Sequence, residues 1–256
     1  MTIYWSIITF TIGSIFGSFY NVVGLRVPLG VDFVKNRSEC MYCKRELSWF
    51  ELVPIFSYVL QKGKCRHCHT SISIIYPIME LCTGFLFLFA YIKIGWNFEL
   101  MVIMLLISLS IIVLVTDLGY MLIPNQILLF FLPLFLIARI IQPLDPWYDT
   151  IFGAIGALVV IGLIIIASQG GMGYGDLKLL MLLGFVLGFK KIIIAFMLAI
   201  CFGAIVSTGL LLTKKVTRKT YIPFAPYIIA GTLISYFYGT DILLWYIGLF
   251  QMNLPL

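Results

Sequence analysis

Two aspartates beside apolar segments are the first candidates for chemistry. Asp117 follows the charge-free run 100–116, and Asp176 follows the charge-free run 150–175. A charged group at such a boundary is expensive, so it is by default a candidate for function. If the two carboxylates meet, one stays protonated as a general acid while the other takes a proton from the water that attacks a peptide carbonyl. This pattern favours aspartic-protease chemistry, although two acids 59 positions apart could equally cap or end separate helices.

Four cysteines form a second candidate site. They are arranged as C-x2-C, an interval of 21 residues, and C-x2-C: Cys40, Cys43, Cys65 and Cys68. Two such turns can supply four thiolates to a tetrahedral Zn²⁺, which would stabilise a loop too short for its own apolar core. Four sulfurs complete the coordination, so His67 and His69 are expected to be spectators. Two disulfides or a thiol redox pair remain alternatives, but disulfides do not persist in a reducing cytoplasm.

Composition indicates that these residues belong to a membrane protein. Hydrophobic residues make up 62% of the chain and charged residues 11%, against roughly 45–50% and about 25% in soluble domains. Such hydrophobicity also excludes a disordered chain. A spanning helix needs about 20 mostly apolar residues. Six charge-free runs approach or exceed this length: 1–25, 100–116, 118–138, 150–175, 192–213 and 220–240.

The predicted fold is all-α, a polytopic helical bundle in the membrane with about eight spans. The expected spans are 2–24, 74–92, 100–116, 124–142, 150–168, 177–189, 192–213 and 221–239. The amphipathic tail 242–256 is expected at the interface. Because the segments 177–189 and 242–256 are ambiguous, seven or nine spans stay open. The cysteines would form a small zinc-binding loop domain between the first two spans.

The net charge of +6 is explained by membrane topology rather than by nucleic acid binding. Eight of the 17 basic residues lie between Arg26 and Arg66, and four more lie at 214–219. Cytoplasmic loops carry the Lys/Arg excess, so both loops are expected inside the cell and both termini outside. The basic residues expected outside are Lys93, Arg139, Lys190 and Lys191. Both aspartates then lie near the cytoplasmic face of the cell membrane.

Several segments resemble the type IV prepilin peptidases, which are intramembrane aspartyl proteases of the G-x-G-D type. The segments are Gly173-Tyr-Gly-Asp-Leu-Lys178, Asp117 with the downstream Ile-Pro-Asn125, Gly17-Ser-Phe-Tyr-Asn21, Pro54-Ile-Phe-Ser-Tyr58, Gly63-Lys-Cys-Arg-His-Cys68 and Ile74-Ile-Tyr-Pro-Ile-Met-Glu80. The G-x-G-D pattern alone is weak. Several segments in the family order over nearly the whole chain make the resemblance specific.

The resemblance implies a reaction and residues for it. Such enzymes cut prepilin or pseudopilin precursors at the cytoplasmic membrane face after a glycine, and many methylate the new N-terminus with S-adenosylmethionine. Asp117 and Asp176 match the catalytic positions. The tentative substrate or methylation residues are Glu80, Lys178, Gly173 and Gly175. The four cysteines are associated with zinc and with methylation, so we predict that residues 1–95 serve methylation and residues 96–256 proteolysis.

Alternative interpretations stay open for single residues and for the whole chain. Glu80 could pair with a basic residue of the loop, and Lys178 could extend its ammonium to the headgroups. A transporter relaying protons through the aspartates would need acids at the bilayer midplane and broken helices in two symmetric halves. A membrane thiol oxidoreductase would need the cysteine loop on the outer face, against the basic-residue bias.

Overall fold

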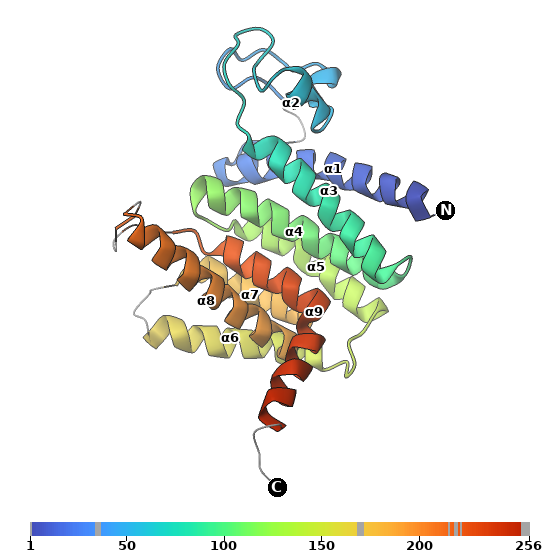
Figure 1. The fold of residues 1–256 in the computed structure, drawn as a ribbon, viewed down its shortest axis with the longest axis vertical. Helices are drawn as coiled ribbons and strands as arrows, with labels where there is room; N and C mark the ends of the chain where they lie inside the picture. The colour runs from blue at the N-terminus through green and yellow to red at the C-terminus, as the bar shows by residue number, and fades with distance from the viewer. Residues whose placement is uncertain are drawn as a thin grey trace. The chain divides into compact units, whose positions relative to one another are not determined.

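A computed structural model describes residues 2–33, 37–167, 172–214, 216–217, 220 and 222–251. Within these ranges the chain is a series of α-helices with no named strand, which confirms the predicted all-α class (Figure 1). Parts of three predicted features lie outside the described residues: the glycine-rich stretch at 168–171, positions 215, 218 and 219 of the basic loop, and the tail at 252–256.

The chain divides into two units, and the first, Met1–Tyr120, carries the cysteine loop. Its three long helices pack against one another: α1 (Thr2–Arg26), α3 (Ile75–Ile94) and α4 (Phe98–Tyr120). The loop connects α1 to α3 and contains three short helices: η1 (Val27–Leu29), η2 (Trp49–Leu52) and α2 (Phe56–Leu60). Figure 1 shows the loop as a lobe at one end of α1 and α3.

The second unit, Met121–Leu256, carries Asp176 on its shortest helix. Its five helices are α5 (Asn125–Ile141), α6 (Asp149–Ala167), α7 (Tyr174–Leu187), α8 (Phe189–Leu212) and α9 (Ala225–Gln251). Helix α7 packs against each of the other four. The unit boundary falls between Tyr120 and Met121, whereas the predicted division of activities falls at 95/96 and stays a prediction.

Small residues allow the helices to approach closely. A Cβ at Gly13 of α1 would lie 2.9 Å from the Cα of Gly84 in α3, and a Cβ at Gly153 of α6 would overlap the backbone of Gly184 in α7. Helices in lipid gain little from hydrophobic burial and associate by close packing at small residues. The glycines on the facing sides of these helices therefore determine which helices are neighbours.

Six of the described helices are long and apolar enough to cross a bilayer: α1, α3, α4, α6, α8 and α9. Helix α5 has 17 residues and α7 only 14. At 1.5 Å per residue, α7 is about 21 Å long, against a hydrocarbon thickness of about 30 Å. A multi-pass helical protein is therefore established, whereas eight spans stay a prediction.

Several helix ends differ from those expected from the sequence, and three of the differences involve an aspartate. Helix α4 continues past Asp117, and α7 begins before Asp176, so both aspartates lie within helical turns. Helix α9 continues through Asp241 to Gln251 rather than ending near 239, because Gly239 alone does not break it. A single charge ends an apolar stretch in the sequence, but it does not end the backbone hydrogen bonding of a helix.

Arg139, which the topology argument counted among the basic residues outside, lies within the predicted span 124–142 and has a buried side chain. It lies in α5 and is 6% exposed. Its Nε and Nη2 donate to the carbonyl of Val186 at 3.0 and 2.7 Å, and Nη1 donates to the carbonyl of Gln142 at 3.3 Å. The carbonyls at a helix end have no partner within the helix. Arg139 therefore caps the end of α7 from inside the unit.

Candidate functional site

Two tight turns present the four cysteines. In the first turn the amide of Cys40 donates to the carbonyl of Arg45 at 2.9 Å, and the carbonyl of Cys40 accepts from the amide of Lys44 at 2.9 Å. Lys44 has a φ of +55°, a left-handed conformation that few non-glycine residues adopt. A bridge between Glu39 and Glu46 closes the base of the turn.

The second turn is built in the same way. The amide of Cys65 donates to the carbonyl of Thr70 at 2.9 Å, and the carbonyl of Cys65 accepts from the amide of His69 at 3.0 Å. His69 has a φ of +56°, and a bridge between Lys64 and Ser71 closes the base. The C-x2-C spacing thus folds twice into one local geometry, which places both sulfurs of each pair on one side of a turn.

The sulfurs of the two turns form one group. The Sγ atoms of all four cysteines lie within 4.8 Å of one another, and those of Cys40 and Cys68 are 3.7 Å apart. Four sulfurs at about 2.3 Å from a zinc ion would be about 3.8 Å apart in a tetrahedron. The donor set therefore fits Zn²⁺. All six cysteines are free, and one cluster of four does not match the two separate dithiols of the redox alternative.

The thiols in this group hydrogen-bond to one another, and the pKa of one is lowered while that of another is raised. Hydrogen bonds from the side chain and backbone of Thr70 lower the pKa of Cys68 to about 6. For Cys43, the backbone hydrogen bond from Arg45 lowers the pKa, but burial and the neighbouring thiols raise it to about 11. Protons held between sulfurs in this way are the ones that a divalent cation displaces on binding.

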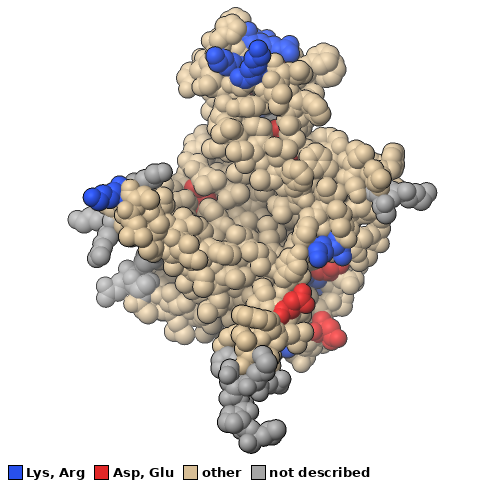
Figure 2. All heavy atoms as spheres, viewed as in Figure 1, with Lys and Arg blue, Asp and Glu red and all other residues tan. Residues whose placement is uncertain are grey.

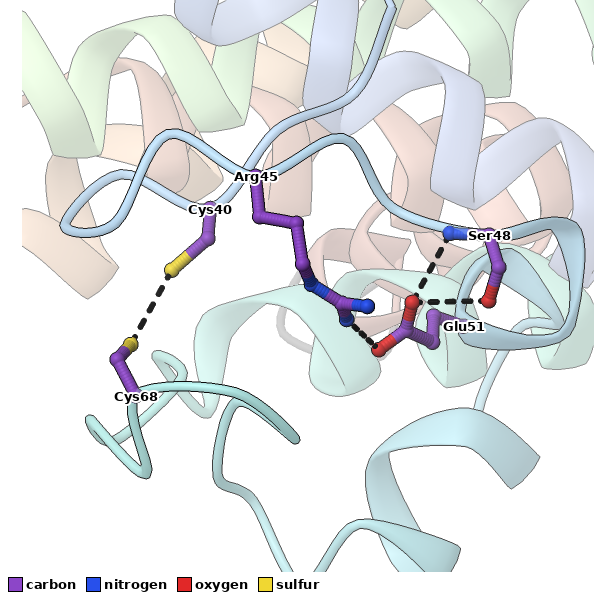
Figure 3. Close-up of polar contacts among 5 residues, drawn as sticks. All are labelled: Cys40, Arg45, Ser48, Glu51 and Cys68. Atoms are coloured by element: carbon purple, nitrogen blue, oxygen red, sulfur yellow. Dashed lines mark hydrogen bonds and ion pairs between the residues drawn. The ribbon is translucent and has the colours of Figure 1, made fainter.

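A buried glutamate supports the loop beside the cysteines (Figure 3). Glu51 accepts hydrogen bonds from the amide of Ser48 at 2.9 Å and from its hydroxyl at 2.8 Å, and Arg45 contacts its other oxygen at 2.5 Å. Burial raises the pKa of Glu51, but the bonds from Ser48 and the charge of Arg45 outweigh it and lower the pKa. Arg45, two residues after Cys43, thereby links the cysteine turn to η2.

Glu80 ties the loop to the helices of the first unit. It lies in α3, is 7% exposed, and accepts the amide of Ile55 on Oε2 at 2.7 Å. The Ser18 side chain of α1 also hydrogen-bonds to it. No ion pair in the described part of the chain involves Glu80, so a backbone amide and a hydroxyl stand where the sequence suggested a basic partner.

The backbone amide that donates its hydrogen bond to Glu80 belongs to a strained turn. Ile55 has φ +64° and ψ −55°, and the amide of Phe56 donates to the carbonyl of Pro54 at 2.6 Å. This is a γ-turn with positive φ, which is rare and strained, and more so for a β-branched residue. The carboxylate of Glu80 therefore holds a backbone conformation that the local sequence does not favour.

The first predicted motif, Gly17 to Asn21, packs against the same part of α3. A Cβ at Gly17 would lie 2.9 Å from the Cα of Glu80. The side-chain amide of Asn21 donates to the carbonyl of Tyr76 at 3.2 Å. Segments that are far apart in the sequence, and that together carried the family resemblance, are thus joined in one unit around Glu80.

Asp117 lies in the last turn of α4 and is 6% exposed. The preceding residue, Thr116, donates its hydroxyl to the carbonyl of Val113 at 2.9 Å. Three residues later, the hydroxyl of Tyr120 donates to the carbonyl of Leu25 at 2.9 Å. The turn that carries Asp117 is therefore fixed to the end of α1.

Asp176 lies in the first turn of α7, which begins after Gly173. Its amide donates to the carbonyl of Gly173 at 3.1 Å, and a Cβ at Gly173 would lie 3.3 Å from its Oδ2. The carboxylate thus folds back over the start of its own helix, and a side chain at Gly173 would crowd it.

The glycine-rich turn contacts the Ile-Pro-Asn125 segment. A Cβ at Gly175 would lie 3.3 Å from the Cβ of Ile123, and the ammonium of Lys178 donates to Oδ1 of Asn125 at 3.0 Å. The second unit therefore joins two motifs about 50 residues apart in the chain. Asp117 and Asp176 belong to different units, and each is described within its own.

Sequence reasoning did not single out several of these residues. Ser18 and Asn21 belong to a quoted motif but had no role assigned. Ile55 was also missed, because no local sequence pattern connects its amide with Glu80, 25 positions away. Asn125 was named only as a motif position. For Arg139, the available signal was a single charge in a long apolar stretch, which is expensive unless the charge faces the protein interior.

Known proteins match nearly the whole chain. Residues 11–94 match the bacterial peptidase A24 N-terminal domain, and residues 104–208 match the type IV leader peptidase family. A prepilin leader peptidase/N-methyltransferase of Bacillus subtilis (strain 168) is 44% identical over 240 residues, which cover 94% of this chain and 97% of that protein. A protein of the same name from Aeromonas hydrophila is 30% identical over 278 residues, which cover 96% and 94%. No solved structure matches the chain.

Proposed function

Because the chain belongs to the type IV leader peptidase family, we propose that it removes the leader of prepilin-like precursors and methylates the new N-terminal residue. The membership confirms the family that the sequence motifs predicted. The observation that carries the proposal is 44% identity, over 94% of the chain, to a protein named for both activities. The substrates are prepilin or pseudopilin precursors, cut after a glycine at the cytoplasmic membrane face.

We assign proteolysis to Asp117 and Asp176. One carboxylate, ionised, takes a proton from a water molecule, whose oxygen attacks the carbonyl carbon of the scissile peptide bond. The other, protonated, donates to the leaving nitrogen as the C–N bond breaks. Both aspartates sit in terminal helical turns, and the supporting motif around Asp176 is joined to a segment that begins six residues after Asp117 in the chain.

Gly175, Gly173 and Lys178 position Asp176 in this proposal. A Cβ at Gly175 would lie 3.3 Å from the Cβ of Ile123, so a side chain there would press on the neighbouring segment. Lys178 anchors the first turn of α7 through Asn125. A catalytic carboxylate has to be held within a fraction of an ångström of its working geometry, and these two contacts restrain the turn from one side.

We assign methylation to the first unit. S-adenosylmethionine supplies the methyl group, and the chain has to hold the newly formed amine in line with it. The four cysteines would hold a structural Zn²⁺ that stabilises the loop. Glu80 bonds to Ile55 of the loop and to Ser18 of α1, and so holds the loop in place. These contacts support a role for Glu80 in methylation as a residue that positions the loop.

The test uses the purified full chain in lipid vesicles with a prepilin peptide and labelled S-adenosylmethionine. Cleavage and methylation are measured separately. Asp117→Asn and Asp176→Asn should each lower cleavage by at least about 100-fold, since a positioned acid or base contributes this much or more. Asp241→Asn is the matched control, because Asp241 is an exposed aspartate in α9. Near wild-type cleavage by either of the first two variants would overturn the assignment.

A further inference from the structure

The loop lobe exposes several large apolar side chains that lie close together in the sequence. We call this set the apolar patch: Trp49, Phe50, Leu52, Val53, Phe56, Val59 and Leu60. Phe56, Val59 and Leu60 are 68%, 66% and 75% exposed, and the rings of Trp49 and Phe50 stack with centroids 3.4 Å apart. An exposed apolar surface of this kind marks a contact with a partner or with a membrane.

The patch is turned outward because the interior of the loop is polar. Glu51, in the middle of these residues, is buried and bonds to Ser48 and Arg45, and the cysteine cluster takes the place of an apolar core. The residues around Glu51 therefore face away from it. A hollow of about 340 Å³ lies in this outer surface, lined by Phe50, Val53, Phe56, Ser57, Leu60 and Arg66.

Basic residues without an acidic partner follow the patch in the chain. Lys62, Lys64 and Arg66 are exposed, and the described residues contain no ion pair that involves them. The three glutamates of the loop are already engaged, in the pairs Glu39–Lys44, Glu46–Arg37 and Glu51–Arg45. Figure 2 shows Lys and Arg side chains gathered on the lobe. The surface thus combines apolar and aromatic side chains with basic side chains that no carboxylate of the described loop pairs with.

We propose that the apolar patch docks into the interfacial layer of an anionic bilayer, with Lys62, Lys64 and Arg66 at the lipid headgroups. Aromatic residues favour this layer, and basic side chains near it gain about 1 kcal/mol each from anionic lipids. Both ends of the loop continue into α1 and α3, which are long and apolar enough to span the membrane. The patch is therefore tethered close to a bilayer, and its charge complements that surface.

The test measures whether lipid covers Trp49 in the full-length protein, reconstituted into phosphatidylglycerol or phosphatidylcholine vesicles. Lipids brominated on their acyl chains quench tryptophan that enters the bilayer, whereas acrylamide quenches tryptophan in water. The signal of Trp49 is the difference between the wild type and Trp49→Phe, so the other four tryptophans stay in place. Brominated lipid should quench this signal and acrylamide should not.

Matched variants separate the apolar and the electrostatic contributions. Phe56→Gln/Leu60→Gln should abolish quenching by brominated lipid, whereas Met41→Gln/Tyr42→Gln, at exposed positions outside the patch, should not. Lys62→Gln/Lys64→Gln should weaken the contact with phosphatidylglycerol vesicles by about 30-fold, the equivalent of two lost charges. Arg37→Gln/Lys44→Gln removes two charges that are already paired and should have little effect. Retained zinc shows that each loop is folded.

Two results would overturn the proposal. One is that acrylamide quenches Trp49 as readily in anionic vesicles as it quenches free tryptophan. The other is that Trp49 is exposed in vesicles and becomes protected only when a prepilin peptide is added, which would make the patch a substrate surface. Neither measurement depends on peptidase or methyltransferase activity, so the outcome is independent of the proposed function.

Discussion

Replacing Glu80 tests whether this carboxylate holds the cysteine loop against α1 and α3. In Glu80→Gln the side chain keeps an acceptor for the amide of Ile55, but the hydrogen bond loses its charge. In Glu80→Ala the acceptor is lost, and the strained turn at Ile55 keeps only backbone hydrogen bonds, such as the one from Phe56 to Pro54. The two variants therefore remove the restraint in two steps.

The expected magnitudes follow from these contacts. A hydrogen bond to a charged group contributes about 1.5–3 kcal/mol and a neutral one about 0.5–1.5, so Glu80→Gln should make loop opening about 1–1.5 kcal/mol easier, or roughly tenfold more frequent. Glu80→Ala also leaves the Ile55 amide without a hydrogen-bond acceptor and the backbone strain uncompensated. The free energy of loop opening should therefore fall by about 3 kcal/mol, so that the loop opens more than about 100-fold more often.

Hydrogen exchange of amides 53–63 in the vesicle-embedded protein measures these opening free energies directly. Glu99→Gln, the same chemical change in the first turn of α4, is the control and should leave exchange in the loop unchanged. The same samples are assayed for cleavage and for methylation of a pre-cut substrate. We expect the variants that lose more protection against exchange in the loop to lose more methylation activity. Their cleavage rates should stay largely intact.

Unchanged exchange in Glu80→Ala would refute the argument, because the contact with Ile55 would then carry no energy. Normal exchange with an equal loss of both activities would instead make Glu80 a shared substrate-binding residue. Faster exchange with normal methylation would separate the loop from methyl transfer.

Three further predictions concern the metal, the pH dependence and the end of α7. Elemental analysis of reduced protein should find about one zinc per chain, and a chelator should loosen the loop and lower methylation more than cleavage. Because the folded-state pKa of Glu51 is lowered, its contribution to loop stability is present above the ordinary glutamate pKa of about 4.3 and is lost as pH falls through the lowered value. At saturating zinc, the difference in exchange between wild type and Glu51→Gln should therefore be constant from about pH 7 to 5 and vanish only in stronger acid. Arg139→Met should destabilise the second unit by about 1–3 kcal/mol in detergent unfolding, because the carbonyl of Val186 loses its donors, and Arg139→Lys should fall between it and wild type.

The predicted helices were recovered because their signals are local. In a bilayer every backbone polar group has to be satisfied within its own helix, so an apolar segment of sufficient length is helical wherever it packs. All eight predicted segments are helices in the structure, with ends displaced where a single charge, as at Asp117 or Asp241, was taken for the end of a helix. The cysteine turns are local in the same sense, since C-x2-C brings two sulfurs together within one turn.

Contacts between distant residues were not predictable in this way. The topology argument counted Arg139 among the basic residues outside, and nothing local indicates that it bonds to the carbonyl of Val186, which lies 47 positions away. The apolar patch is exposed because Glu51 and the cysteines occupy the interior of the loop, an arrangement that no sequence pattern indicates.

The sequence by itself determined the class of protein, the helical segments, the family and the four-cysteine cluster, since each depends on composition or on spacings within a turn or a motif. The tertiary structure decided that Glu80 accepts the amide of Ile55, that Lys178 bonds to Asn125, and that the apolar patch faces outward. These outcomes depend on which polar groups satisfy one another across the fold. Buried donors and acceptors have to be paired, and only packing brings the partners together.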